Sequence, residues 1–143
     1  MARLLALDIG EKRIGVAISD ESHVLARPLT TILRASKRED FDKIAALIAE
    51  HGVERLVAGM PRTLRDEEGP QARRVRRYVE ALSAAVDKPV VFQDERYSSV
   101  EAGERLALGS KRKPRGRGEI DAAAAAIILQ NYLNQMMKDE SER

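Results

Sequence analysis

The chain has 143 residues, enough for one domain with a substantial core, and its 43% hydrophobic and 34% charged residues are typical of a globular protein. Cysteine is absent, which excludes disulfides, thiolate nucleophiles and zinc ribbons, and the two histidines, His23 and His51, lack the spacing of a ligand pair or a triad. No apolar run approaches the roughly 20 residues of a membrane span and no signal peptide is evident, so we expect a cytoplasmic protein without membrane contact.

The first third of the sequence predicts a three-stranded antiparallel meander. An apolar run at 3–8 is followed by a glycine-containing turn, and residues 13–19 alternate in the manner of a pleated strand. A third strand is expected from Val24 to Ile32. Pro28 places this strand towards an edge of the sheet, because proline cannot donate a ladder hydrogen bond.

The rest of the sequence alternates helix and strand. Apolar residues recur at three- and four-residue steps from Arg38 until Gly52 ends the helix. We then expect a strand at 55–59, a polar loop at 61–68, a helix at about 70–86, a strand at 90–93, a short helix at 98–107 and a last helix from 120 to about 137. The order βββαβαβα predicts an α/β fold with a mixed sheet. A single domain at 1–138 and a frayed tail at 139–143 are expected.

Three acidic residues lie at the ends of predicted elements. Asp8 ends the first strand, Glu95 follows the strand at 90–93, and Asp121 is expected in the first turn of the last helix. Charged groups at the edges of buried elements cost free energy unless they are paired or bind a metal. We expect Asp8 on the central strand and Glu95 at the end of a neighbouring parallel strand, with the three carboxylates meeting where the strands end.

Carboxylates gathered at one place repel one another unless divalent cations bridge them. Oxygen ligands without histidine or cysteine favour Mg²⁺ or Mn²⁺ over zinc. The sequence therefore indicates a phosphodiester hydrolase with a two-metal-ion mechanism, in which Asp8, Glu95 and Asp121 are both catalytic residues and metal ligands and Asp8 is best placed to bridge both ions.

Basic side chains near this site are candidates for binding phosphate. The stretch 110–118 contains no acid and is either a solvated loop or a clamp for a polyanionic substrate. Arg62 and Arg96 are closest to the acidic residues in sequence, and each could instead pair with a nearby acid. The full set of candidate substrate-binding residues is Arg62, Arg96, Lys12, Arg13, Lys111, Arg112, Lys113, Arg115 and Arg117.

Four motifs span nearly the whole chain: LDIGEKRIGVA at 7–17, AGMPR at 58–62, DERYSS at 94–99 and DAAAAAIILQ at 121–130. In this order they resemble the YqgF family, also called RuvX. The resemblance implies a ribonuclease-H-like fold with helices on both faces of the sheet, related to Holliday junction resolvases. It also implies a bacterial nuclease that trims the 5′ end of pre-16S ribosomal RNA.

The family's acidic positions correspond to Asp8, Glu95 and Asp121. Asp94 competes with Glu95, because neighbours on a strand face opposite ways, and the family's pattern favours Glu95. Two mild departures are Ser98-Ser99, where many members have Ser-Thr or Thr-Thr, and Ala58, where valine is usual.

Three functions stay open for this chain, which we expect to be a monomer or weak homodimer. They are an RNA nuclease, a Holliday junction resolvase that presents two sites as a dimer, and a non-catalytic nucleic-acid-binding assembly factor. With 3% aromatic residues, contacts to nucleic acid should be mainly with phosphate. The turn after Asp8 is also similar to that of actin-like ATPases, but the chain is too short for their second lobe.

Overall fold

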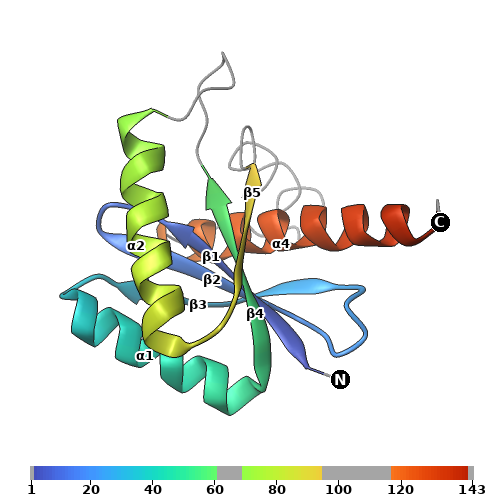
Figure 1. Cartoon of the computed structure of the whole chain (residues 1–143), viewed down its shortest axis with the longest axis horizontal. Helices are drawn as coiled ribbons and strands as arrows, with labels where there is room; N and C mark the ends of the chain where they lie inside the picture. The colour runs from blue at the N-terminus through green and yellow to red at the C-terminus, as the bar shows by residue number, and fades with distance from the viewer. Residues whose placement is uncertain (1, 61–68, 95–116, 142–143) are drawn as a thin grey trace.

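A five-stranded sheet in the order β3-β2-β1-β4-β5 forms the centre of the protein (Figure 1). The structure, a computed structural model, describes residues 2–60, 69–94 and 117–141. The strands are β1 (Arg3–Ile9), β2 (Arg13–Ser19), β3 (Ala26–Leu33), β4 (Val53–Met60) and β5 (Val90–Asp94). The helices are α1 (Lys37–His51), α2 (Pro70–Val86) and α4 (Arg117–Ser141). The predicted α/β class, element order and central first strand are confirmed.

The sheet combines antiparallel and parallel pairs, as predicted. β1, β2 and β3 form the meander with β3 at the edge, and β4 pairs parallel to both β1 and β5. The prediction that the strand before Glu95 neighbours β1 is wrong, because β4 lies between them. The crossover through α1 places β4 beside β1, and the crossover through α2 places β5 on the far side of β4. The backbones of β1 and β5 are therefore two strand spacings, about 10 Å, apart.

The last helix begins earlier and ends later than predicted. It starts at Arg117, so Asp121 lies in its second turn rather than its first, and it continues to Ser141. Gly118, which suggested a loop, lies in the first turn of this helix, where glycine costs less than in a helix interior. The predicted loop at 61–68 and short helix at 98–107 lie outside the described residues.

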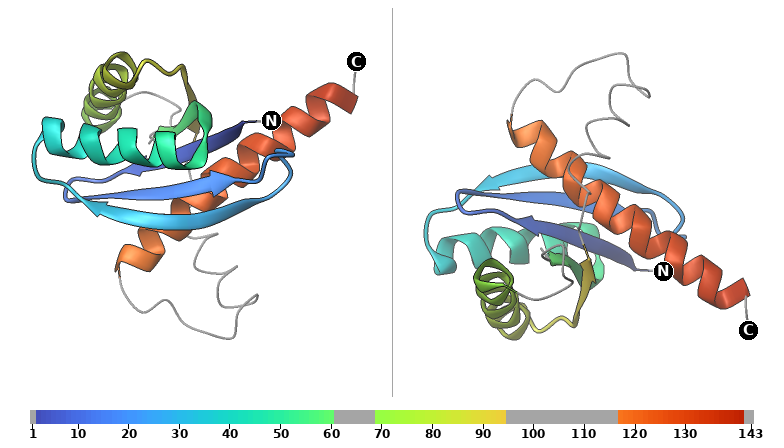
Figure 2. Two further views of the ribbon diagram at one scale, coloured as in Figure 1. Left: turned by 90° about the horizontal axis from the view of Figure 1, so that it is seen from below. Right: turned by 90° about the horizontal axis from the view of Figure 1, so that it is seen from above.

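Helices cover both faces of the sheet, as Figure 2 shows: α1 and α2 lie on one side, and α4 crosses the other. On β1, Leu5 and Leu7 belong to the cluster beneath α1 and α2, whereas Leu4 and Ala6 pack against α4. Because side chains alternate along a strand, Asp8 points to the α4 face. In the described segments, no helix is long and apolar enough to cross a bilayer.

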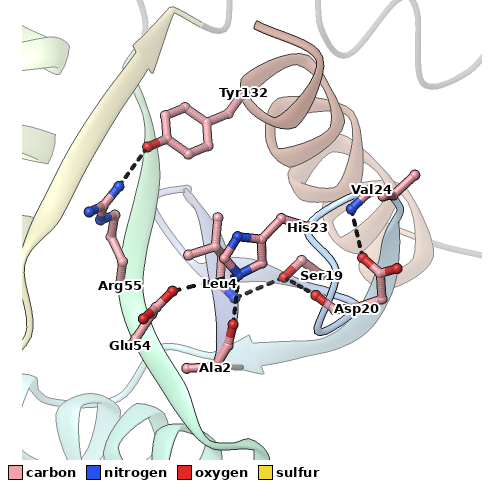
Figure 3. A network of polar contacts seen from close by, with 9 residues as sticks. All are labelled: Ala2, Leu4, Ser19, Asp20, His23, Val24, Glu54, Arg55 and Tyr132. Atoms are coloured by element: carbon pink, nitrogen blue, oxygen red, sulfur yellow. Dashed lines mark hydrogen bonds and ion pairs between the residues drawn. The ribbon is translucent and has the colours of Figure 1, made fainter. Parts of the chain in front are cut away.

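A polar network ties the start of β1 to the end of β2 and the turn that follows it (Figure 3). The hydroxyl oxygen of Ser19 accepts the N–H of Leu4 at 2.8 Å, and the ring of His23 donates to the carbonyl oxygen of Ala2 at 2.6 Å. His23 lies in the turn after β2 and contacts the start of β1, whereas Asp8 lies near the other end of β1. A structural role therefore accounts for this histidine.

A buried carboxylate joins both covering helices to the turn after β1. Asp40 on α1 is 2% exposed and accepts hydrogen bonds from the hydroxyl of Tyr78 at 2.9 Å and the N–H of Ala35 at 3.0 Å. Arg34 lies 3.9 Å from this carboxylate and 4.5 Å over the ring of Tyr78, and it donates to the carbonyl oxygen of Gly10 at 2.6 Å. Burial, together with the bond to Asp40, raises the pKa of Tyr78. Its hydroxyl is thereby kept as a donor.

We expect Tyr78→Phe to lower the free energy of unfolding by about 1.5–3 kcal/mol, because a buried charged acceptor loses a donor. Tyr132→Phe is the matched control, since its hydroxyl accepts a bond from Arg55 at 3.1 Å at a partly exposed position (Figure 3). We expect this control to cost about 0.5 kcal/mol or less. Urea unfolding measures both, and equal losses would contradict the role given to Asp40.

Candidate active site

Asp8 lies near the carboxyl end of the central strand, with glycine at the neighbouring position of each adjacent strand. On β2 its partner is Gly15. On β4, Ala58 pairs with Leu7, and the next residue is Gly59. Neither glycine places a side chain beside the aspartate. On the α4 face, no side chain from the neighbouring position of either adjacent strand therefore lies beside this partly exposed carboxylate.

Gly15 lets α4 approach the sheet at this point. A Cβ atom at Gly15 would lie 1.9 Å from the carbonyl oxygen of Asp121, a separation that real Cβ atoms do not adopt. Any larger residue would therefore push the helix away from β2. Since Gly15 is paired with Asp8, the close approach brings Asp121 next to Asp8 although the two are far apart in sequence.

Arg13, at the start of β2, holds the side chain of Asp121. Its Nε donates to Oδ2 of Asp121 at 2.9 Å, and both side chains are 28% exposed. A charge-assisted bond of this length fixes the orientation of the carboxylate. The two side chains border a pocket of about 430 Å³ whose described lining is Gly10, Glu11, Lys12, Arg13 and Asp121.

The end of β5 reaches the same edge of the sheet. Gly59 on β4 pairs with Gln93, and β5 ends one residue later at Asp94. Phe92 packs with the cluster beneath α1 and α2, so the position of Gln93 faces α4. The chain therefore leaves β5 next to the glycine that flanks Asp8.

Of the predicted site residues, Asp121, Arg13 and Lys12 line the pocket beside the turn after β1, and Asp8 is paired with Gly15, which contacts the backbone of Asp121. Arg117 is the first residue of α4. The other candidates lie outside the described residues: Glu95, Arg62, Arg96, Lys111, Arg112, Lys113 and Arg115. Over the described ranges, no group of three or more acidic or histidine side chains is arranged to hold a metal ion. The two described acids offer carboxylate oxygens, the ligand type that Mg²⁺ prefers.

Two features of the site are not predicted by the sequence pattern. Arg13 is a candidate for binding phosphate by its charge and position, and the structure adds its bond to Asp121. The contact of Gly15 with the backbone of Asp121 was also not predicted, although the sequence contains a signal for it. Gly15 interrupts a strand, where glycine often marks the close approach of another backbone.

A mixed sheet of this order, with helices on both faces and an aspartate on the central strand, defines a ribonuclease-H-like fold of the resolvase type. Thermus thermophilus RuvC in complex with a Holliday junction substrate has a TM-score of 0.62 at 15% identity, over 96% of this chain and 97% of that chain. The fowlpox virus resolvase in complex with Holliday junction DNA has a TM-score of 0.58 at 10% identity, over 94% and 99%. The expected fold is confirmed.

Sequence comparison defines the family. The RuvX family, described as "Holliday junction resolvase", matches residues 2–135. Two relatives named "Putative pre-16S rRNA nuclease" come from Chloroflexus aggregans and Thermoanaerobacter pseudethanolicus. The first is 47% identical over 131 residues, 92% of each chain, and the second is 43% identical over 133 residues, 92% of this chain and 96% of the relative. This protein belongs to the RuvX family, which confirms the resemblance stated above.

We expect Gly15→Ala to destabilise the protein by about 1–3 kcal/mol, because α4 must move to admit a methyl group. Gly52→Ala is the control: Gly52 has φ 64° and open space around an added Cβ, so its cost of about 1–2 kcal/mol comes from backbone strain alone. Amide hydrogen exchange separates the two effects. Only Gly15→Ala should speed exchange in α4 relative to the other helices. Unchanged protection of α4 in that variant would contradict the contact.

Proposed function

We propose that this protein is a metal-dependent nuclease that hydrolyses phosphodiester bonds, with Asp8, Glu95 and Asp121 as its catalytic and metal-binding carboxylates. The observation that carries the proposal is the approach of Asp121 to Asp8 through Gly15. Placing two acids from separate elements side by side is unfavourable unless cations offset their charge. Arg13 supplies one such cation. Bound divalent ions would offset the charge of both carboxylates.

The position of β5 supports Glu95 as the third carboxylate. Odd-numbered positions of this strand face α4, because Phe92 packs on the opposite face. The two strand spacings between β1 and β5 are wide for a direct carboxylate contact. Gly59 on the intervening β4 places no side chain between the ends of β1 and β5. Because a glutamate side chain is longer than that of aspartate, Glu95 is better suited than an aspartate to extend across β4.

The donor set fits Mg²⁺ or Mn²⁺, since it consists of carboxylate oxygens and the chain has no cysteine. Bound divalent ions would lower the pKa of a water molecule and stabilise the leaving oxygen, as in two-metal-ion nucleases. The bond from Arg13 uses Oδ2 of Asp121, so Oδ1 is the oxygen that we assign to metal binding. Asp8 is held by the backbone of the central strand.

Cationic side chains at the pocket rim suit a phosphate-rich substrate. Lys12 is exposed in the turn beside Arg13 and forms no ion pair with a described residue. We assign it to a phosphate next to the cleaved bond. Arg62, Arg96 and the basic residues of 110–118 remain proposed contacts to the flanking phosphates.

The proposed substrate is the 5′ end of pre-16S ribosomal RNA, which places the protein in the bacterial cytoplasm. The support is the name carried by relatives that this chain matches over more than nine tenths of their length. A second candidate is cleavage of branched DNA, favoured by the family description and by the fold shared with a junction-bound resolvase. Junction resolution requires paired nicks and a dimer. A monomer that leaves four-way junctions intact would exclude it.

We expect Asp8→Asn and Glu95→Gln each to reduce Mn²⁺- or Mg²⁺-dependent cleavage of precursor RNA by about 100-fold or more, the effect of removing a group that stabilises transition-state charge. Asp94→Asn is the matched control and should leave cleavage nearly unchanged. Unchanged biological activity of Asp8→Asn in the cell would favour the non-catalytic assembly factor, whereas full cleavage by this variant would remove Asp8 from the proposed catalytic set. Loss in Asp94→Asn with retention in Glu95→Gln would reassign the third carboxylate.

A further inference from the structure

A second pocket adjoins the active site across the turn between β1 and β2. Its volume is about 440 Å³, and it opens beside α1 and α2, on the opposite face of the sheet from α4. Among the described residues, its charged lining consists of four cations and one acid: Arg34, Lys37, Arg74, Arg77 and Glu11. We call it the α1–α2 cationic pocket.

The cations of this pocket divide into fixed and available groups. Arg34 is held by Gly10 and Asp40, and its guanidinium lies over an aromatic ring. Lys37, Arg74 and Arg77 are exposed, and none forms an ion pair with another residue in the described part of the chain. The two α2 arginines are three residues apart, so they point to the same side of the helix. The pocket thus offers several positive charges on a preformed wall.

The lining favours phosphate over bases. Tyr78 is the aromatic residue in the described lining of this pocket and is 4% exposed, with one side covered by the guanidinium of Arg34 at 4.5 Å. Phe41 packs edge-on against it, with ring centroids 5.3 Å apart. The ring therefore offers no free face on which a base could stack. Arginine and lysine side chains instead suit the phosphodiester backbone.

We propose that the α1–α2 cationic pocket binds the phosphodiester backbone of the nucleic-acid strand that extends from the active site. Gly10 and Glu11 line both pockets, so a strand that leaves Asp121 and crosses the turn enters the cationic pocket directly. The path depends on the proposed nuclease function, since that function places the strand at the carboxylates. The pocket lies apart from the candidate substrate contacts identified from the sequence.

Glu11 opposes this strand path. It is exposed on the turn between the two pockets, where its charge repels a passing phosphate. A strand that crosses the turn should therefore bind more tightly to Glu11→Gln. If the strand avoids the turn, Glu11→Gln should increase affinity only through the general loss of one negative charge. Glu39→Gln is the control for this general effect, because Glu39 is an exposed residue of α1.

The test compares two double variants that each remove two positive charges. The pocket variant changes two arginines of α2, and the control variant changes one arginine of α1 and one of α2. Arg74→Gln with Arg77→Gln alters the pocket. Arg38→Gln with Arg73→Gln alters exposed positions outside its lining. Fluorescence anisotropy in EDTA measures binding of a single-stranded RNA over a range of salt concentrations, and a four-way DNA junction is measured in parallel. No cleavage is needed for this readout.

We expect the pocket variant to reduce the slope of log affinity against log salt by about 1.4 for single-stranded RNA, since each lost phosphate contact contributes about 0.7. The control variant should retain the wild-type slope, and Glu11→Gln should bind more tightly than Glu39→Gln. A slope loss with either probe supports the pocket. Because each lost contact contributes about 0.9 with duplex DNA and about 0.7 with a single strand, the preferred nucleic acid is the one that loses more contacts after this correction. Equal slopes in the two double variants would overturn it.

Cleavage assays with Mn²⁺ separate this inference from the proposed function. If the wild-type protein fails to cut but the slope falls only in the pocket variant, the pocket stands as a phosphate-backbone site and the nuclease function fails. If the pocket variant binds and cuts as the wild type does, the nuclease function stands and the pocket is rejected.

Discussion

The contact between Gly15 and the backbone of Asp121 determines where α4 lies on the sheet. A hydrogen atom in place of a side chain lets the helix backbone touch β2, and Ala6 and Ala17 continue this narrow surface along the same face. Close packing in a protein interior tolerates little change in volume, so the helix has few alternative positions. The packing that closes the core thereby also sets Asp121 beside Asp8.

Electrostatics then explains the residues around the turn between β1 and β2. Within the turn, the N–H of Gly10 donates to the carbonyl oxygen of Arg13 at 2.8 Å, and the N–H of Arg34 donates to that of Lys12 at 2.9 Å. Arg13 is directed to Asp121 on the α4 face, while Arg34 is directed to Asp40 on the other. The turn is thus held from both faces. Cations flank it on both sides, as a surface that follows a polyanion requires.

The sequence predicts the helices and strands of this fold better than it predicts which strands lie next to one another in the sheet. Periodicity and turn residues identify the meander, the two covering helices and the edge position of β3, because these signals are local. The insertion of β4 between β1 and β5 depends on long-range pairing, which has no local signal. The burial of Asp40 could not be predicted either. Nothing in the helical pattern distinguishes a buried aspartate that accepts two hydrogen bonds from an exposed one. For the site, the positions of Asp8 and Asp121 were predictable as element ends, whereas their approach through Gly15 required the packed structure.

Crystals of the protein grown with Mn²⁺ and measured at a wavelength where manganese scatters anomalously test the account most directly. Carboxylates that serve one two-metal-ion reaction must all bind the ions of that site, whatever the substrate. The account predicts anomalous density for manganese at one site, in contact with the carboxylates of Asp8, Glu95 and Asp121. Manganese bound only by acids elsewhere, with Asp8 and Asp121 contacting no ion at saturating metal, would contradict it.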